Sequence, residues 1–412
     1  MKWGAAINAT SAGRQNRALI LETVQRTGAI SRSRLARSTG MTPATITNAV
    51  RDLIDLGLLM PTGDLAPRQR ATPGAPSFLL GLDRRHHRVL SIHQGVSRVR
   101  LGLHDIGGAV LASSDLATGV GEPALRTVER TVQAVRRLLR AHKVTRDRVR
   151  GVGLGAVGLI DPESGFVRSA PNLGWVDVPL GALLQKALGW PVIARNNVYG
   201  MAAGELRFGG VPEANAVYVY VGTGIGAGII ADNHVLDGEH GAAGEIGHLV
   251  VPGGGPCSCG KSGCLETVAA ELSIVRRAWS VPEVRAAAKA GHKPAVARLV
   301  DRAKAGDDRA REILTQVAEN LAFALAQVTE IIDPGAIIVS GIVVDAGPLF
   351  LEPLATTLRR STFAARGRNV SVRPAHFGDE AGMVGAAALA LEAFVYNPRA
   401  ELLAERTSRV AR

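Results

Sequence analysis

The chain has 412 residues, of which 46% are apolar and 20% charged, so a largely disordered protein is excluded and two or three globular domains are expected. Its formal net charge is +12, and residues 1–88 hold 13 Lys or Arg against only 5 Asp or Glu. This concentration of charge is typical of a nucleic-acid-binding head on a nearly neutral body, although a solvated basic surface explains it equally well.

Membrane and secretion signals are absent from the sequence. No apolar run approaches the ~18 residues of a membrane-spanning helix. The first twenty residues also lack the long apolar stretch of a signal peptide. Both observations predict a cytoplasmic protein without membrane contacts.

The first 60 residues have the pattern of three helices, the first over 16–25 and the second over 31–38. The third begins at Thr42 and Pro43, because threonine is a favourable N-cap and proline suits the first helical position. Gly57 supplies its stop. Apolar residues of this helix recur at i, i+4, i+7 and i+8, namely Ile46, Val50, Leu53 and Ile54. The spacing predicts a helix-turn-helix.

The polar face of the third helix is the surface expected to contact DNA. Short polar side chains near the start of such a helix contact base edges in the major groove, and an arginine one turn later suits a base or a phosphate. The alternative is a small helical cap with a polar outer face. The residues expected to contact double-stranded DNA here are Thr45, Thr47, Asn48 and Arg51, together with Arg37 on the preceding helix.

Residues 61–77 contain four prolines and no helical period. They are predicted to form a β-wing followed by a linker, with Arg68 and Arg70 placed to enter a minor groove. An ordinary proline-rich linker is the alternative. We therefore expect a winged helix-turn-helix domain over residues 1–75 and a second domain over 76–412.

The second domain has strands alternating with helices, which predicts an α/β fold. Glycine turns separate two strand-led units, so two lobes, approximately 85–195 and 196–395, are expected to flank a cleft. The predicted strands are 78–82, 89–93, 99–104, 152–159, 192–194 and 216–220, with a glycine turn over 222–228. Helices are predicted over 121–142, 179–188 and 316–332. The last has an apolar face suited to a dimer interface, although a core helix is the favoured interpretation.

The cysteines form the strongest site pattern. All three lie within eight residues, which excludes a disulfide scaffold. With the histidine that precedes them, they make a set of four tetrahedral zinc ligands that leaves no open position. The predicted structural zinc ligands are His248, Cys257, Cys259 and Cys264. The alternative is three reduced cysteines without a metal.

Several stretches resemble the ROK family (repressor, open reading frame, kinase). The most specific is EIGH followed by CSCGKSGCLE; APNLGW, ARNNVYGMAAGE and GTGIGAG are supporting matches. The resemblance covers roughly residues 85–395 together with the winged helix-turn-helix of the regulator branch. It implies a two-lobed body of the sugar-kinase and actin-like type, a zinc loop and a homodimer or dimer of dimers.

The resemblance also implies a set of sugar contacts. In kinases of this family, an Asn-Asp pair, a Glu and His beside the zinc loop and a later Glu hold the sugar hydroxyls. These roles fall on Asn196, Asn197, Glu245, His248 and Glu266. Amide and carboxylate groups suit several hydroxyls at once. The alternatives are that Asn196 only caps a helix and that Glu266 only braces the zinc loop.

Departures from the kinase pattern argue against phosphoryl transfer. The family's general base is the Asp of the Asn-Asp pair, and its position here is Asn197, whose amide cannot accept the proton. The family's first phosphate loop, Asp-x-Gly-Gly-Thr, is replaced by HQGVS, from His93 to Ser97. Paired glycines expected near the nucleotide base appear as Ser340 and Gly341. We therefore expect no catalytic residues.

The sequence as a whole predicts a DNA-binding transcriptional regulator, with repression favoured over activation. It is expected to sense a sugar or sugar derivative in a degenerate kinase cleft. One alternative is a sugar kinase that phosphorylates a hexose or N-acetyl sugar and carries a fused DNA-binding head. Another is a regulator that is controlled through its body by a protein partner.

Overall fold

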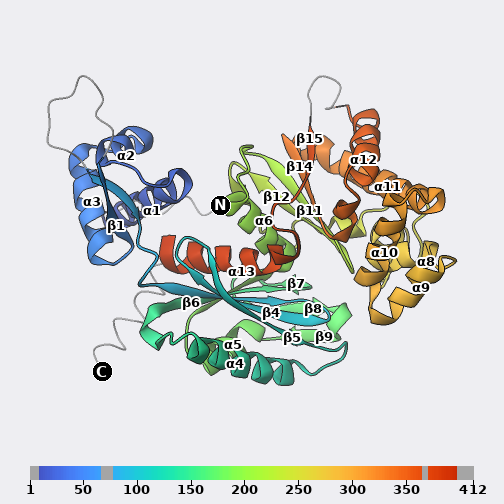
Figure 1. Ribbon diagram of the computed structural model, residues 1–412, viewed down its shortest axis with the longest axis horizontal. Helices are drawn as coiled ribbons and strands as arrows, with labels where there is room; N and C mark the ends of the chain where they lie inside the picture. The colour runs from blue at the N-terminus through green and yellow to red at the C-terminus, as the bar shows by residue number, and fades with distance from the viewer. Residues whose placement is uncertain (1–8, 66–77, 364–369, 397–412) are drawn as a thin grey trace.

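A computed structural model describes residues 9–65, 78–363 and 370–396, and it confirms an α/β protein with a helical N-terminal unit (Figure 1). The helices of that unit are α1 (Ala9–Thr27), α2 (Arg32–Thr39) and α3 (Pro43–Asp55). As predicted, Ser31 caps α2 and Thr42 caps α3, each accepting a hydrogen bond from the backbone N–H three residues on. Only α1 is much longer than predicted.

The wing is an antiparallel pair of strands, β1 (Leu59–Leu65) and β2 (Phe78–Leu82). Leu80 in β2 also bridges to Ile30 between α1 and α2, so β2 completes the N-terminal unit and lies beyond residue 75. Gly57 takes a positive φ of 66° after α3, as its predicted role as a stop requires. Arg68 and Arg70 lie outside the described residues.

The first lobe is built on a five-stranded sheet of order β10-β6-β3-β4-β5. Its strands are β3 (Arg88–Gln94), β4 (Arg98–Asp105), β5 (Val110–Ala117), β6 (Val149–Ala156) and β10 (Val192–Asn196). Helices α4 (Ala124–Ala141) and α5 (Leu180–Leu188) lie on one face (Figure 1). A small sheet of β7 (Leu159–Ile160), β8 (Val167–Ala170) and β9 (Trp175–Val178) extends the lobe.

The second lobe has a sheet of order β13-β12-β11-β14-β15. Its strands are β11 (Ala216–Val221), β12 (Ile225–Ala231), β13 (His234–Val235), β14 (Ala336–Ser340) and β15 (Ser371–Pro374). Its helices are α7 (Glu266–Ala269), α8 (Glu271–Arg277), α9 (Pro282–Ala287), α10 (His292–Lys304), α11 (Asp308–Ile332) and α12 (Pro348–Ser361). None of the helices in the described part of the chain combines the length and apolar character needed to span a bilayer.

The glycine turn of the second lobe is shorter than predicted. It was expected over residues 222–228, whereas β12 already begins at Ile225. The reason is packing against a helix, because a Cβ at Gly228 would lie 2.2 Å from the Cβ of Ala202. Two of the glycines thus let the strand approach a helix instead of turning the chain.

Two buried helices, α6 (Asn197–Phe208) and α13 (Ala381–Leu391), join the lobes (Figure 1). Helix α13 packs on β3 and β6, α6 packs on β12, and the two helices pack on each other. Their contact depends on small residues, since a Cβ on Gly385 would lie 2.4 Å from the backbone of Gly200. The hinge region between the lobes is therefore a close helix pair.

The N-terminal unit is packed onto the end of this helix pair. Its buried core, including Leu21 and Val24 of α1, is continuous with Leu391, Phe394 and Tyr396. The last two belong to the single π-helical turn that follows α13, over 392–396. The far end of α13 is thus part of the core that holds the helix-turn-helix.

Candidate functional site

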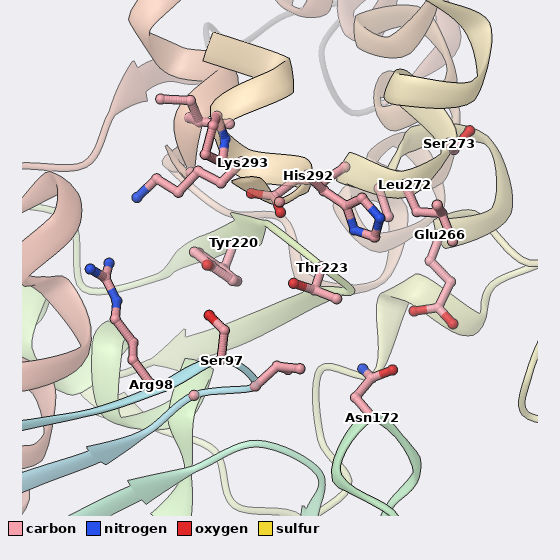
Figure 2. A pocket seen from close by; sticks show the side chains of 18 of the residues that line it. Ser97, Arg98, Asn172, Tyr220, Thr223, Glu266, Leu272, Ser273, His292 and Lys293 are labelled. Carbon is pink, nitrogen blue, oxygen red and sulfur yellow. The ribbon is translucent and has the colours of Figure 1, made fainter. Parts of the chain in front are cut away.

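A cavity of about 1000 Å³ opens between the two lobes. Figure 2 shows the polar side chains that face it, including Ser97 from the first lobe and Tyr220 and Thr223 from the second. The lining combines hydroxyl, amide, carboxyl and basic groups with apolar side chains. Such a site suits a polar, hydroxyl-rich ligand better than an apolar one.

Glu266, at the start of α7, is the predicted sugar contact that lines this cavity. Figure 2 shows its carboxylate and the Asn172 amide facing the same space from opposite lobes. Asn172 was not predicted as a site residue, although it lies in the APNLGW stretch that carried the resemblance. A carboxylate and an amide on opposite walls can hold two hydroxyls of one ligand.

The asparagine pair lies at the junction of β10 and α6. Asn196 caps α6, with its Oδ1 accepting a hydrogen bond from the N–H of Val198 at 2.8 Å, while its Nδ2 donates to the carbonyl of Gly158 at 2.9 Å. Both ends of this amide therefore have a structural role. Asn197 is the buried first residue of α6. Neither side chain lines the cavity, so their sugar contacts remain predictions that need the cleft to close.

Glu245 and His248 flank one 3₁₀ turn, over Ile246–His248. The Nδ1 of His248 lies 3.8 Å from a carboxylate oxygen of Glu266 and 3.7 Å from the sulfur of Cys257. His248 therefore joins the cysteine cluster to the wall of the cavity. Contacts of Glu245 and His248 with a sugar likewise remain predictions.

The four predicted metal ligands come together. Ligand atoms of His248, Cys257, Cys259 and Cys264 all lie within 4.8 Å of one another. The sulfurs of Cys259 and Cys264 are 3.7 Å apart, and a tetrahedron with zinc–sulfur bonds of about 2.3 Å puts two sulfurs about 3.7 Å apart. This donor set fits a metal ion, and tetrahedral sulfur and nitrogen ligands suit zinc.

The HQGVS stretch, which the resemblance suggests as the counterpart of the family's first phosphate loop, has no acidic side chain. His93 and Gln94 belong to strand β3, and the turn itself is reduced to residues 95–97. Burial, together with the nearby Arg100, lowers the pKa of His93 to about 4. The imidazole is therefore neutral near pH 7, and it carries none of the charge with which a carboxylate would hold a magnesium ion.

Sequence reasoning missed several ionisable groups of the cavity, among them Glu271 and Lys293. Burial raises the pKa of Glu271 to about 7. Lys293 is in the first turn of α10 and forms an ion pair with Asp379 across the hinge. Neither residue belongs to a recognisable motif, and only the packing of α8 and α10 on each other and on α11 brings them to the cleft.

The predicted DNA-contacting face of α3 is exposed. Asn48 and Arg51 are exposed, and Arg37 is exposed on α2. The hydroxyl of Thr47 donates to the carbonyl of Pro43 at 2.8 Å, and Thr45 is hydrogen-bonded to the capping Thr42. Asn48 and Arg51 are thus the side chains on α3 best placed to contact base edges or phosphates.

Helix α11 is mainly a core helix, as favoured from the sequence, but it also carries an exposed apolar stripe. Phe323 and Ile331, eight residues apart on one face, are 43% and 81% exposed. Phe363, which follows α12 and whose backbone N–H is bound by Glu330, is 79% exposed. Large exposed apolar side chains of this kind are typical of association surfaces.

Comparison with known proteins places both parts of the chain. Residues 89–393 match the model of the ROK family, and residues 14–60 match a winged helix-turn-helix DNA-binding model. A xylose repressor from Caldicellulosiruptor bescii is 28% identical over 383 residues, which cover 91% of this chain and 95% of the repressor.

Comparison with solved structures also separates the winged helix-turn-helix part of the chain from the ROK body. A ROK family transcriptional regulator, described as a homologue of the Escherichia coli Mlc protein, superposes with a TM-score of 0.78 at 25% identity, covering 96% of this chain and 99% of the other. A ROK glucokinase from Streptomyces griseus, solved with glucose and AMPPNP, is 32% identical with a TM-score of 0.62. It covers 73% of this chain and 98% of its own, so the similarity to the regulator includes a part that the kinase similarity does not cover.

Proposed function

This chain belongs to the ROK family and carries an N-terminal winged helix-turn-helix, and we propose that it is a sugar-responsive transcriptional repressor. Residues 1–75 are assigned to DNA binding, together with strand β2 that completes their fold, and the rest of residues 76–412 to sensing. The observation that carries the proposal is the packing of the helix-turn-helix core onto the helix pair that joins the two lobes. A xylose repressor and an Mlc homologue, both similar over nine-tenths of the chain or more, support it.

DNA recognition is assigned to α3 in the major groove. Asn48 and Arg51 are exposed on this helix, and Arg37 on α2 is placed to hold the phosphate backbone. Thr45 and Thr47 are assigned to backbone or base contacts near the helix start. Arg68 and Arg70 are assigned to the minor groove through the wing.

Effector binding is assigned to the cavity between the lobes. Glu266 and Asn172 take two hydroxyls of a sugar from opposite walls. Closure of the lobes moves the remaining predicted contacts, Asn197, Glu245 and His248, toward the ligand. Helix α6, which Asn196 caps, moves with them. A ligand that binds the closed form better than the open one shifts the balance between them.

The metal in the cysteine cluster is assigned as structural zinc. Three thiolates and an imidazole fill all four tetrahedral positions, so no position is left for catalysis. The ion would hold the loop 248–264 and, through the Cys257 sulfur 3.1 Å from the Glu266 carboxylate, the position of the sugar-binding wall.

Phosphoryl transfer is assigned as lost. Asn197 stands where the general base is required, and the neutral His93 stands where a kinase of this family has a carboxylate. A sugar kinase is therefore the weaker hypothesis, although the body is 32% identical to a glucokinase. Sugar-dependent consumption of ATP by the purified protein would support the kinase hypothesis instead.

Signal transmission is assigned to Arg207, near the end of α6. Its guanidinium donates to Gln25 of α1 at 3.1 Å, pairs with Glu22 of α1 at 3.7 Å and binds Glu392 after α13. Because α6 starts at the asparagine pair and ends at this arginine, one rigid helix runs from the cleft to the DNA-binding unit. Movement of the lobes therefore reaches α1 directly.

The protein is further assigned as a cytoplasmic homodimer without membrane contacts. Two-fold dimers match the two half-sites of an operator. The exposed Phe323, Ile331 and Phe363 supply a candidate interface between copies. Pairs of such dimers on one operator are compatible with the same surface.

The test is binding of the protein to DNA upstream of its own gene, by fluorescence anisotropy at fixed salt, with and without a panel of sugars. We expect specific binding that one sugar weakens by about 5- to 150-fold, the usual range of allosteric coupling. Asn48→Ala should weaken specific binding, whereas Arg359→Ala, an exposed change on α12, should leave it intact. Specific binding that no sugar alters would favour control by a protein partner, and no specific binding would overturn the proposal.

A further inference from the structure

A buried arginine joins the two lobes outside the cavity. Arg195, in β10 of the first lobe, is 6% exposed. Its Nε lies 2.9 Å from a carboxylate oxygen of Asp237, which follows β13 of the second lobe. Neither residue lines the cavity. This ion pair is therefore a contact between the lobes that lies apart from the space for a ligand.

The other partners of Arg195 are uncharged. Its Nη1 donates to the carbonyl of Pro162 at 2.7 Å and to that of Ala194 at 2.8 Å, and its guanidinium lies 5.9 Å from the centre of the Tyr199 ring. Asp237 thus supplies the negative charge within ion-pair distance of this buried cation. Separating a buried ion pair is strongly unfavourable, because it leaves a charge without compensation. The lobes are therefore held together at this point.

The loop that carries Asp237, over residues 236–244, is fixed on both lobes. Its two ends are hydrogen-bonded to β12, where the N–H of Leu236 donates to a carbonyl and the carbonyl of Gly244 accepts from an N–H, both at 2.8 Å. Between them, a Cβ on Gly241 would lie 2.2 Å from the carbonyl oxygen of Ile160 in β7. Figure 1 shows β7 at the side of the first lobe that faces the second. The loop thus belongs to the second lobe but packs on the first at Asp237 and Gly241.

The ion pair connects the two sets of predicted sugar contacts. Arg195 immediately precedes Asn196 and Asn197, at the junction of β10 and α6. On the other side, the loop over 236–244 leads directly into Glu245 and the turn that ends at His248. One contact therefore sets the position of the first set relative to the second.

We propose that Arg195 and Asp237 are positioning residues, whose ion pair is the fixed point about which the two lobes close on a sugar. This inference rests on the proposed sensing function and adds the contact that keeps both sets of sugar-binding side chains in register. Closure about this point rotates one lobe against the other and narrows the cavity while the ion pair stays intact. Sliding of the lobes past each other would separate the pair, and the buried charge opposes that movement.

The first test needs no ligand. Asp237→Asn keeps the shape of the side chain and removes its charge. Amide hydrogen exchange of the unliganded protein should become about tenfold faster or more over residues 159–162 and 236–244, because the contact between these segments opens locally. Asp237→Glu restores the charge and should restore the protection of both segments. Unchanged exchange in Asp237→Asn would overturn the proposal.

The second test measures sugar binding by isothermal titration with glucose, xylose, mannose and N-acetylglucosamine. Asp237→Asn should weaken binding of the sugar that the unaltered protein binds by about tenfold or more. Asp237→Glu should bind that sugar nearly as the unaltered protein does. The matched control is Glu213→Gln, because Glu213 pairs with Arg373 at 2.6 Å within the second lobe and its side chain is 23% exposed, against 31% for Asp237. The control should change neither sugar binding nor exchange over 159–162 and 236–244.

The outcomes separate a positioning role from a purely structural one. A lower melting temperature for Asp237→Asn with unchanged sugar affinity would assign the pair to stability alone, which would overturn the proposal and leave sugar sensing standing. If none of these sugars binds the unaltered protein or changes its DNA binding, the proposed function fails and the role in closure fails with it. Faster exchange in Asp237→Asn would then still identify the pair as a contact between the lobes.

Discussion

The N-terminal unit and the interlobe cleft are built in different ways. In the N-terminal unit, α2 and α3 each begin at a cap, Ser31 and Thr42, whose side chain contacts the backbone three positions on. In the cleft, Ser97 of the first lobe shares one cavity with Glu266 and Lys293 of the second lobe, and only the arrangement of the two lobes brings these residues together. The first kind of structure follows local rules, whereas the second depends on the whole topology.

Helices α6 and α13 belong to both regions. Each begins close to the cleft and ends against the core of the helix-turn-helix, so they are the elements through which the two regions affect each other. The comparison therefore predicts three kinds of variant: those that change only the cleft, those that change only DNA binding and those that change the coupling between them.

The largest effect is expected at the zinc loop. Cys259→Ser should release the metal and destabilise the second lobe by about 4 kcal/mol or more, because loss of a metal ligand is among the most damaging single changes. Ser262→Ala, an exposed change in the same loop, should do neither. Elemental analysis and calorimetry measure the two effects, and one zinc per chain retained in the Cys259 variant would contradict the ligand set.

The next effect contrasts one substitution at two positions. Gly385→Ala places a Cβ 2.4 Å from the backbone of α6 and should destabilise the protein by about 1–3 kcal/mol through overpacking. Gly13→Ala in α1 meets nothing within 4 Å and should stabilise that helix by up to about 1 kcal/mol. Urea unfolding measures the free energy of unfolding of both variants. If Gly385→Ala did not destabilise the protein, the helix pair would not be closely packed.

A change confined to the DNA-binding face should leave the cleft untouched. Arg51→Ala should weaken operator binding by about 1–3 kcal/mol, the range for one specific contact. Its thermal shift on adding a sugar should equal that of the unaltered protein, because Arg51 is exposed and distant from the hinge. Fluorescence anisotropy measures the operator affinity, and thermal unfolding measures the shift caused by the sugar. Unchanged operator affinity would contradict the assignment of α3 as the helix that contacts the bases.

The smallest effect concerns pH. Burial raises the pKa of Glu271 to about 7 from 4.5, so the native state keeps a proton that the unfolded chain releases. This contribution to stability therefore falls as pH rises from 4.5 to 7. We expect about 1 kcal/mol between pH 5 and 7, since the residue borders a cavity that admits water.

Glu271→Gln should remove that slope, and the exposed control Glu312→Gln should retain it. Buried His93 and His104, whose pKa values are lowered to about 4, act in the opposite sense, because they destabilise the fold as pH falls below 6.5. Urea unfolding at a series of pH values measures the difference between the two glutamate variants. Identical slopes would show that Glu271 is ionised in the folded protein.

The sequence predicted what depends on near neighbours. The capped helices, the stop at Gly57 and the gathering of His248 with three cysteines all follow from short spacings. The role of Gly228 could not be predicted, because its packing against α6 is a long-range contact. For the same reason Lys293 and Glu271 went unnoticed. Asn196 was predicted to bind sugar, but both ends of its amide cap and tie the start of α6.

The most direct test of the account is the effect of Arg207→Ala on communication between cleft and DNA. It uses operator affinity measured by anisotropy with and without the sugar that the panel identifies as the effector. The account predicts that the variant binds DNA alone and ligand alone much as the unaltered protein does, but that ligand no longer changes its operator affinity. An unchanged ligand effect in the variant would contradict the claim that α6 carries the signal from the cleft to α1.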